Sequence, residues 1–180
     1  MRLLIESIAR ITSSLLLVIL AAAAPSLRAQ DVETTVPACP STATLDQLIK
    51  AVDAAVSGPA NKDRTCFRAL FLPETRLIPL RHMPDGSYQP RVLTVDDWIT
   101  AVGKRGSESF TEKQIKVETQ IYGHMAHLWS TYETLGADGK IMDRGINSIQ
   151  ALFDGKQWKV LQIVWQAESP TERVPEKYLP

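Results

Sequence analysis

The second half of the chain restricts the fold most strongly, because it reads as four strand-like segments in immediate succession. These segments run over about residues 110–122, 125–135, 140–153 and 157–168. They are separated by Gly123-His124, by a four-residue loop at 136–139 and by Asp154-Gly155. Loops of these lengths and residue types close β-hairpins. The sequence therefore predicts an antiparallel meander.

Amphipathic helices precede this meander. Thr44 is a suitable N-cap with Gln47 three positions later, and apolar residues then recur at helical spacing until Ser57-Gly58-Pro59. A second, shorter helix is predicted over about residues 62–72, where Pro73 would end it.

One strand-like segment, residues 76–82, separates these helices from a third helix. Pro79 lies within the segment and cannot donate a hydrogen bond to a neighbouring strand, so an edge strand or a bulge is expected there. Thr94 then caps a helix over about residues 95–105. The element order predicts an α+β fold, with helices packed on an antiparallel sheet.

The hairpin turns fix a register that sorts the strand residues onto two faces. On the face expected to lie toward the helices, four polar side chains stand among aliphatic ones: Ser130, Tyr132, Asn147 and Gln162. Buried amides and hydroxyls need partners, so the group either forms an internal hydrogen-bond network or lines a ligand pocket. Trp98 on the third helix could add an aromatic wall.

The opposite face collects large apolar residues, and a protein partner would explain them. We predict a homodimer through this face, with Trp129 and Trp165 near its centre. The predicted interface residues are Trp129, Ile146, Leu161, Ile163 and Trp165. A bulge at Gly155 would exchange the faces of the last strand alone.

The first 29 residues read as a secretory signal peptide. Arg2 and Arg10 are followed by the apolar run ITSSLLLVILAAAA and by SLRA before Gln30. The run is about 14 residues long, short of the roughly 20 that span a bilayer, so a permanent anchor is the weaker alternative. We expect a periplasmic or secreted chain with no membrane association after cleavage. Residues 30–43 are expected to form a lead-in segment and residues 169–180 an extended tail.

The two cysteines and the charge narrow the possibilities further. Cys39 and Cys66 would both be exported, where a disulfide can form; the alternative is two buried thiols. Two cysteines without nearby histidines do not form a zinc site, and no metal site is expected. Without residues 1–29 the formal net charge is −2, and no Lys/Arg cluster stands out, so a nucleic-acid partner is not expected.

Two segments resemble the last strands of the nuclear transport factor 2-like superfamily, which includes the SnoaL-like and ketosteroid-isomerase-like proteins, particularly its exported bacterial members. The segments are GHMAHLWSTYE (123–133) and RGINSIQALFDGKQWKVLQIVWQAE (144–168). The resemblance covers about residues 44–168. It implies a strongly curved, cone-shaped α+β barrel, a pocket between sheet and helices, and frequent dimerisation through the convex face.

This scaffold hosts enzymes and plain binding modules alike. Ketosteroid-isomerase-like catalysis needs carboxyl groups in the pocket, but the register places no Asp or Glu on the inner face. His82 and Tyr132 are the only weak catalytic candidates, and no cofactor is expected. The favoured interpretation is an exported domain that binds a small, mainly apolar molecule. The alternatives are a lyase or isomerase acting by proton transfer and a non-catalytic protein-interaction scaffold.

Overall fold

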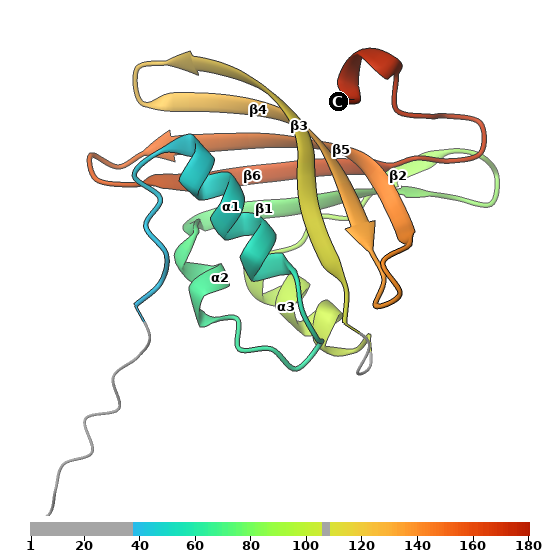
Figure 1. The fold of residues 1–180 in the computed structure, drawn as a ribbon, viewed down its shortest axis with the longest axis horizontal. Helices are drawn as coiled ribbons and strands as arrows, with labels where there is room; N and C mark the ends of the chain where they lie inside the picture. Colours follow the sequence, from blue (N-terminus) through green and yellow to red (C-terminus); the bar gives the residue numbers. More distant parts are fainter. Residues whose placement is uncertain (1–37, 106–108) are drawn as a thin grey trace, which may run out of the picture. The chain divides into compact units, whose positions relative to one another are not determined.

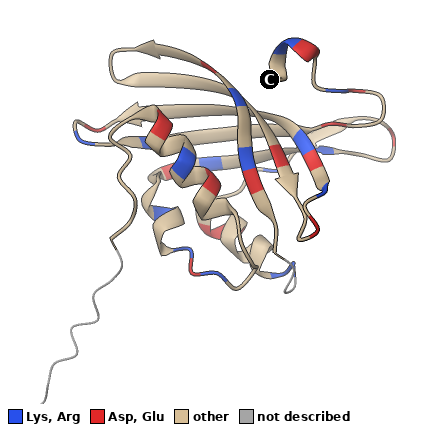
Figure 2. Ribbon diagram, viewed as in Figure 1, with Lys and Arg blue, Asp and Glu red and all other residues tan. Residues whose placement is uncertain are grey.

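The computed structural model describes residues 38–105 and 109–180, which form helices packed on a six-stranded sheet (Figure 1). The predicted signal peptide and most of the predicted lead-in segment lie outside these residues. The strand order is β2-β1-β6-β5-β4-β3, and the sheet is open rather than closed. The predicted α+β class is therefore confirmed. Lys and Arg alternate with Asp and Glu over the elements, without a long stretch of either sign (Figure 2).

Two of the three helices begin at the predicted caps. α1 (Leu45–Val56) and α3 (Val95–Gly103) are capped by Thr44 and Thr94, each in a reciprocal capping box. α2 (Thr65–Ala69) is much shorter than predicted, because the chain enters a strand at Phe71, before Pro73. Within the described residues, no helix is long and apolar enough to cross a bilayer.

The four predicted strands are confirmed as an antiparallel meander. They are β3 (Thr111–Tyr122), β4 (Met125–Leu135), β5 (Ile141–Phe153) and β6 (Trp158–Ala167). The expectation of an all-antiparallel sheet is wrong, however, because β1 (Phe71–His82) pairs parallel to β6. Pro79 does not lie on an outer edge, since the short strand β2 (Tyr88–Pro90) flanks β1.

Two bulges change which residues face the helices. In β3, Gln114 pairs with Tyr132 and Lys116 with Thr131, so Ile115 is the extra residue. In β6, Leu161 is the extra residue, and Ile163 pairs with Ile149. A bulge shifts the alternation by one, so every residue beyond it changes face. Between each bulge and the nearby hairpin turn, β3–β4 or β5–β6, the residues lie on the faces predicted for them. On the other side of each bulge, the residues of that strand lie on the face opposite to the predicted one.

We call the sheet face covered by the helices the inner face and the opposite one the outer face. On the inner face, α1 packs Leu48 and Val52 against a buried apolar cluster that includes Leu128, Ile149 and Val160. The end of α1 also binds the edge of β3. Ser57 bonds both backbone polar groups of Glu112, and Asp53 accepts a hydrogen bond from the backbone N–H of Gln114.

A disulfide joins Cys39 to Cys66, 27 residues apart. It ties the residues before α1 to α2, the shortest α-helix of the described residues. On the loop-entropy account such a bridge stabilises by about 3 kcal/mol.

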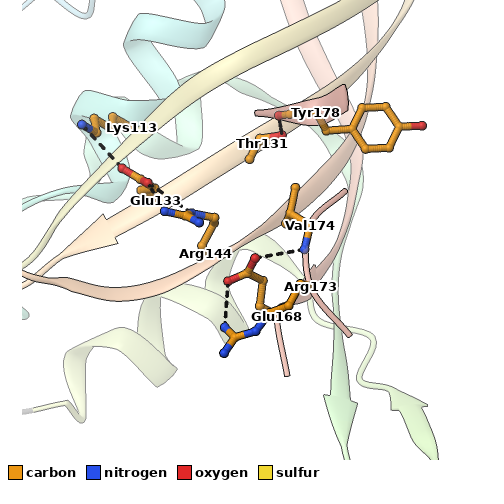
Figure 3. A network of polar contacts seen from close by, with 8 residues as sticks. All are labelled: Lys113, Thr131, Glu133, Arg144, Glu168, Arg173, Val174 and Tyr178. Atoms are coloured by element: carbon orange, nitrogen blue, oxygen red, sulfur yellow. Dashed lines mark hydrogen bonds and ion pairs between the residues drawn. The ribbon is translucent and has the colours of Figure 1, made fainter. Parts of the chain in front are cut away.

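The C-terminal tail folds back over part of the outer face. Glu168 accepts hydrogen bonds from the backbone N–H of Val174 and from Arg173, at 2.9 and 3.3 Å (Figure 3). Further along, Thr131 Oγ1 donates to the carbonyl of Tyr178 at 2.6 Å. The Tyr178 ring lies 5.9 Å from that of Trp129, centroid to centroid. The tail thus lies on the body of the domain.

Candidate functional site

A cavity of about 410 Å³ lies between the helices and the half of the inner face beyond the bulges. Aromatic side chains form much of its wall: Phe67, Trp98, Phe110, Tyr132 and Trp165. Aliphatic side chains of α1, β1 and β6 complete the apolar surface. A cavity of this size, with apolar walls and a group of polar side chains, is typical of small-molecule sites.

Two carboxyl groups line the cavity, one on β3 and one on β5, with β4 between them. Glu112, Thr134 and Asp143 are cross-strand partners in one row of β3, β4 and β5, and all three contribute to the wall. Asp53 on α1 lies close by, bonded to Gln114. No ion pair involves any of these three acids within residues 38–105 and 109–180. The acids therefore lie near one another without an ion pair, although the charge of Arg105 acts on Glu112 and Asp143.

Burial and mutual repulsion favour the protonated acids. Removal from water, followed by the neighbouring charges of Asp53 and Asp143, raises the pKa of Glu112 to about 7. Removal from water also raises the pKa values of Asp53 and Asp143, although hydrogen bonds from Gln114 and Tyr132 oppose this. At neutral pH, Glu112 is thus divided between its neutral and its charged form.

Tyr132 supplies a hydroxyl donor at this row. Its O–H donates to Asp143 Oδ2 at 3.2 Å. Removal from water and the nearby charges of Asp143 and Glu112 raise the pKa of Tyr132 far above its usual value. The phenol therefore remains protonated and can act only as a neutral hydrogen-bond partner.

A hydrogen-bond network centred on Gln114 closes one side of the cavity. Gln114 Oε1 accepts from Ser130 Oγ at 2.5 Å and from Asn147 Nδ2 at 3.2 Å. Its Nε2 donates to Asp53 at 3.0 Å. Two members of the polar group predicted from the sequence, Ser130 and Asn147, are thus partnered internally, which was one of the two alternatives.

The structure brings together only part of the predicted ligand site. Trp98, Tyr132 and Asn147 line the cavity, whereas Ser130 lies behind it, bonded to Gln114. Gln162 does not belong to the inner face, because the Leu161 bulge turns it outward to pair with Gln150.

His82, one of the two weak catalytic candidates, lies away from the cavity. It is exposed at the end of β1, pairs with Tyr88 and has its ring 5.1 Å from the tyrosine ring. Nothing in this geometry places His82 beside a ligand.

The predicted dimer residues divide between the two faces. Ile163 and Trp165 turn inward beyond the Leu161 bulge and contact the core, so their placement on the outer face was wrong. Trp129 and Ile146 do lie on the outer face, where they line a second hollow of about 300 Å³ with the tail. Leu161, the bulge residue, is partly exposed.

Sequence reasoning missed the acids of the cavity. It assigned no Asp or Glu to the inner face, but Glu112 faces inward because the Ile115 bulge lies between it and the β3–β4 turn. Asp143 was likewise not among the candidate site residues, although it lines the cavity near the start of β5. The sequence around Ile115 contains no turn residue or proline from which this bulge could have been predicted. Within the part of the chain that the structure describes, no three His, Cys, Asp or Glu side chains are placed to hold a metal ion.

Comparisons with known proteins show the fold. No protein-family profile and no curated protein matches the chain. A solved structure from Exiguobacterium sibiricum, an inferred Ca/calmodulin-dependent kinase II association domain, is 11% identical with a TM-score of 0.53. The match covers 71% of this chain and 92% of that one.

Two further solved structures match with 12% identity, a TM-score of 0.52 and coverage of 73% of this chain and 90% of theirs. One is an inferred β subunit of an aromatic-ring-hydroxylating dioxygenase from Novosphingobium aromaticivorans, and the other is a nuclear transport factor 2-like protein of unknown function from Pseudomonas putida. The chain therefore has the nuclear transport factor 2-like fold. Identities this low establish the fold and no activity.

Proposed function

We propose that this protein is an exported domain that binds a small, mainly apolar molecule in the cavity of its inner face. The observation that carries the proposal is the cavity itself, about 410 Å³ with aromatic walls and a few polar groups gathered on one side. Side chains would normally fill a space of this size in a folded core.

Export is supported by two features of the chain. The first 29 residues have the composition of a secretory signal peptide, and Cys39 and Cys66 are joined, as in proteins of oxidising compartments. Fractionation of cells expressing the full chain tests this directly. Full-length protein retained in the cytoplasm would contradict export.

A ligand screen by thermal shift tests the binding proposal. A ligand present at a hundredfold excess over its dissociation constant should stabilise the protein by about 2.7 kcal/mol. Thr134→Phe would fill the cavity from β4 and should abolish every such shift. Thr119→Phe places the same side chain at an exposed position of β3 and should leave the shifts unchanged. Shifts that survive Thr134→Phe would locate the ligand elsewhere.

A second candidate function, proton transfer by a lyase or isomerase, is favoured by one observation. Glu112, with a pKa of about 7, and the protonated phenol of Tyr132 face the same cavity. A carboxylate base near neutrality and a neutral hydroxyl donor can together move a proton next to a carbonyl group. In this scheme Glu112 takes the proton from the α carbon and returns it to the γ carbon. Tyr132 turns its one O–H from Asp143 to the carbonyl oxygen, where it stabilises the intermediate enolate.

Solvent exchange distinguishes catalysis from binding alone. A cyclic β,γ-unsaturated ketone such as 3-cyclohexenone, incubated with the protein in D₂O, should gain deuterium and isomerise faster than in buffer. Glu112→Gln should remove this rate, while Glu118→Gln, at an exposed position of β3, should retain it. Equal rates with and without protein would exclude this ketone chemistry.

We also propose that the protein forms a homodimer, through a part of the outer face different from the one predicted from the sequence. The tail covers the region of Trp129, so a partner copy would use the remaining part of the outer face, where Tyr122, Met125 and Leu152 are neighbours on adjacent strands and exposed. Sedimentation at micromolar concentration should show a dimer, and Met125→Asp should dissociate it. A wild-type monomer would refute this proposal.

A further inference from the structure

The polar side of the cavity has a strongly one-sided charge. Glu112 and Asp143 line it, Asp53 lies behind Gln114, and the charge of Glu168 also acts on Asp143. Arg105, after α3, is the only cation among the lining residues that the structure describes, and its guanidinium lies over the ring of Phe110. Three acids thus act on this region against Arg105, and the fourth, Glu168, is itself paired with Arg173.

The carboxyl group of Glu112 has almost no partner of its own. Its one hydrogen-bond contact is with Gln114 Nε2 at 3.5 Å, the outer limit for such a bond. That amide already donates to Asp53 at 3.0 Å. Because a buried charge without a partner is costly, the Glu112 carboxyl, turned into a cavity, is a group that a ligand could satisfy.

Three kinds of ligand head group would behave differently at this position. An anion would be repelled by Glu112 and Asp143. A neutral group would leave the charged carboxylates as they are. A cation would remove their repulsion and provide the missing partner, and this attraction is stronger between partly buried groups than at a surface.

We propose that the ligand of this cavity is a hydrophobic amine, bound with its ammonium group at Glu112 and Asp143 and its apolar body against the aromatic walls. This inference rests on the proposed binding function and names the class of ligand. Trp165 and Tyr132 contribute aromatic surface to the same cavity. Ammonium groups are also attracted to aromatic faces.

Binding of such a cation is coupled to proton release. With a pKa of about 7, Glu112 is mostly protonated at pH 5 and mostly ionised at pH 8. A permanently charged ligand should therefore bind at least about tenfold more tightly at pH 8, because only the ionised state attracts it. A ligand that instead accepts a hydrogen bond from protonated Glu112 would show the opposite pH dependence.

Isothermal titration of the disulfide-bonded protein with three probes of one shape tests the proposal. Benzyltrimethylammonium carries a positive charge, neopentylbenzene is its neutral isostere, and benzylsulfonate carries a negative charge. We expect the ammonium to bind at least tenfold more tightly than the neutral probe at pH 8, and the sulfonate not to bind. Glu112→Gln should remove most of this preference and its pH dependence, and Asp143→Asn should reduce it.

The exposed residue Glu118 provides the matched control, because Glu118→Gln removes a carboxylate from the same strand outside the cavity. It should leave the preference intact. Equal binding of the ammonium and the neutral probe would overturn the amine assignment and leave the binding function standing. If none of the probes bound, and the ligand screen also failed, the binding function itself would be lost. Melting temperatures of all three variants at each pH exclude unfolding as the cause.

Discussion

The inner face of the sheet has two halves that differ in how they are filled. Toward the β3–β4 and β5–β6 turns, apolar side chains such as Leu128, Ala151 and Val160 are completely buried under α1. Beyond the bulges at Ile115 and Leu161, a cavity replaces this packing, and acids line it. We call these the packed half and the cavity half. The contrast indicates that the packed half stabilises the fold, while the cavity half retains polar groups at a cost in stability.

The largest effect is expected at Gly145, where the cavity half depends on a close approach of two strands. A Cβ atom at this position would lie 2.1 Å from the carbonyl oxygen of Gln166. Gly145→Ala should therefore force β5 and β6 apart and destabilise the protein by at least about 3 kcal/mol, or prevent folding. Denaturant titration measures this. Gly103→Ala, where an added Cβ meets no atom within 4 Å, should have no such effect and serves as the control.

The next largest effect on stability is expected from truncating one buried aliphatic side chain in each half. Leu128→Ala in the packed half should cost about 3 kcal/mol, because the side chain is fully buried and leaves a new void. Ile163→Ala should cost about 1 kcal/mol less, because Ile163 already borders the cavity and has fewer contacts to lose. Equal losses in urea unfolding would mean that the cavity half is packed as tightly as the other.

The acids of the cavity half should make stability depend on pH. The pKa of Glu112 is raised from 4.5 to about 7 on folding, so the unfolded chain loses this proton first and stability falls as pH rises through that range. Glu112→Gln should be more stable than wild type by on the order of 2 kcal/mol above pH 7, and should not differ below pH 4. Thermal unfolding over pH 4 to 8 measures the difference. A constant difference across this range would contradict the burial of a titrating carboxyl group.

The smallest effect is expected from the hydroxyl of Tyr132. Tyr132→Phe removes its hydrogen bond to Asp143 and should cost about 1 kcal/mol while leaving the ring in place. The pKa of Asp143 should rise further, because that hydrogen bond lowers it. Tyr122→Phe, at a position where the side chain is 79% exposed, should not change stability. Chemical denaturation of both variants gives the comparison.

The packed half and the meander could be predicted from the sequence because they follow local rules. The Gly123-His124 turn sets the register directly, and simple alternation then places Ala126 and Leu128 on the inner face. Thr44 and Thr94 were recognisable because a capping box uses residues only three positions apart. These features need no information from distant parts of the chain.

The cavity half could not be predicted because its geometry depends on distant contacts. The extra residues of β3 and β6 are tolerated where α1 bonds the edge of β3 and where β1 pairs with β6, contacts between segments tens of residues apart. Each bulge reverses the alternation for everything beyond it. Gln162, Ile163 and Trp165 were therefore placed on the wrong face, and Glu112 was missed.

The contact between the end of α1 and the edge of β3 also protects the protein from aggregation. Ser57 and Asp53 occupy the backbone groups of Glu112 and Gln114 that would otherwise point out from an edge strand. An additional strand from another molecule therefore cannot add there without displacing a helix. Beyond the bulge, from Lys116 to Tyr122, β4 is the only strand that borders β3 among the described residues, so the other edge of β3 is open. Lys116, Glu118 and Gln120 occur at every second position along it. Aggregation through strand addition would have to begin in this segment, where Lys116 and Glu118 oppose it.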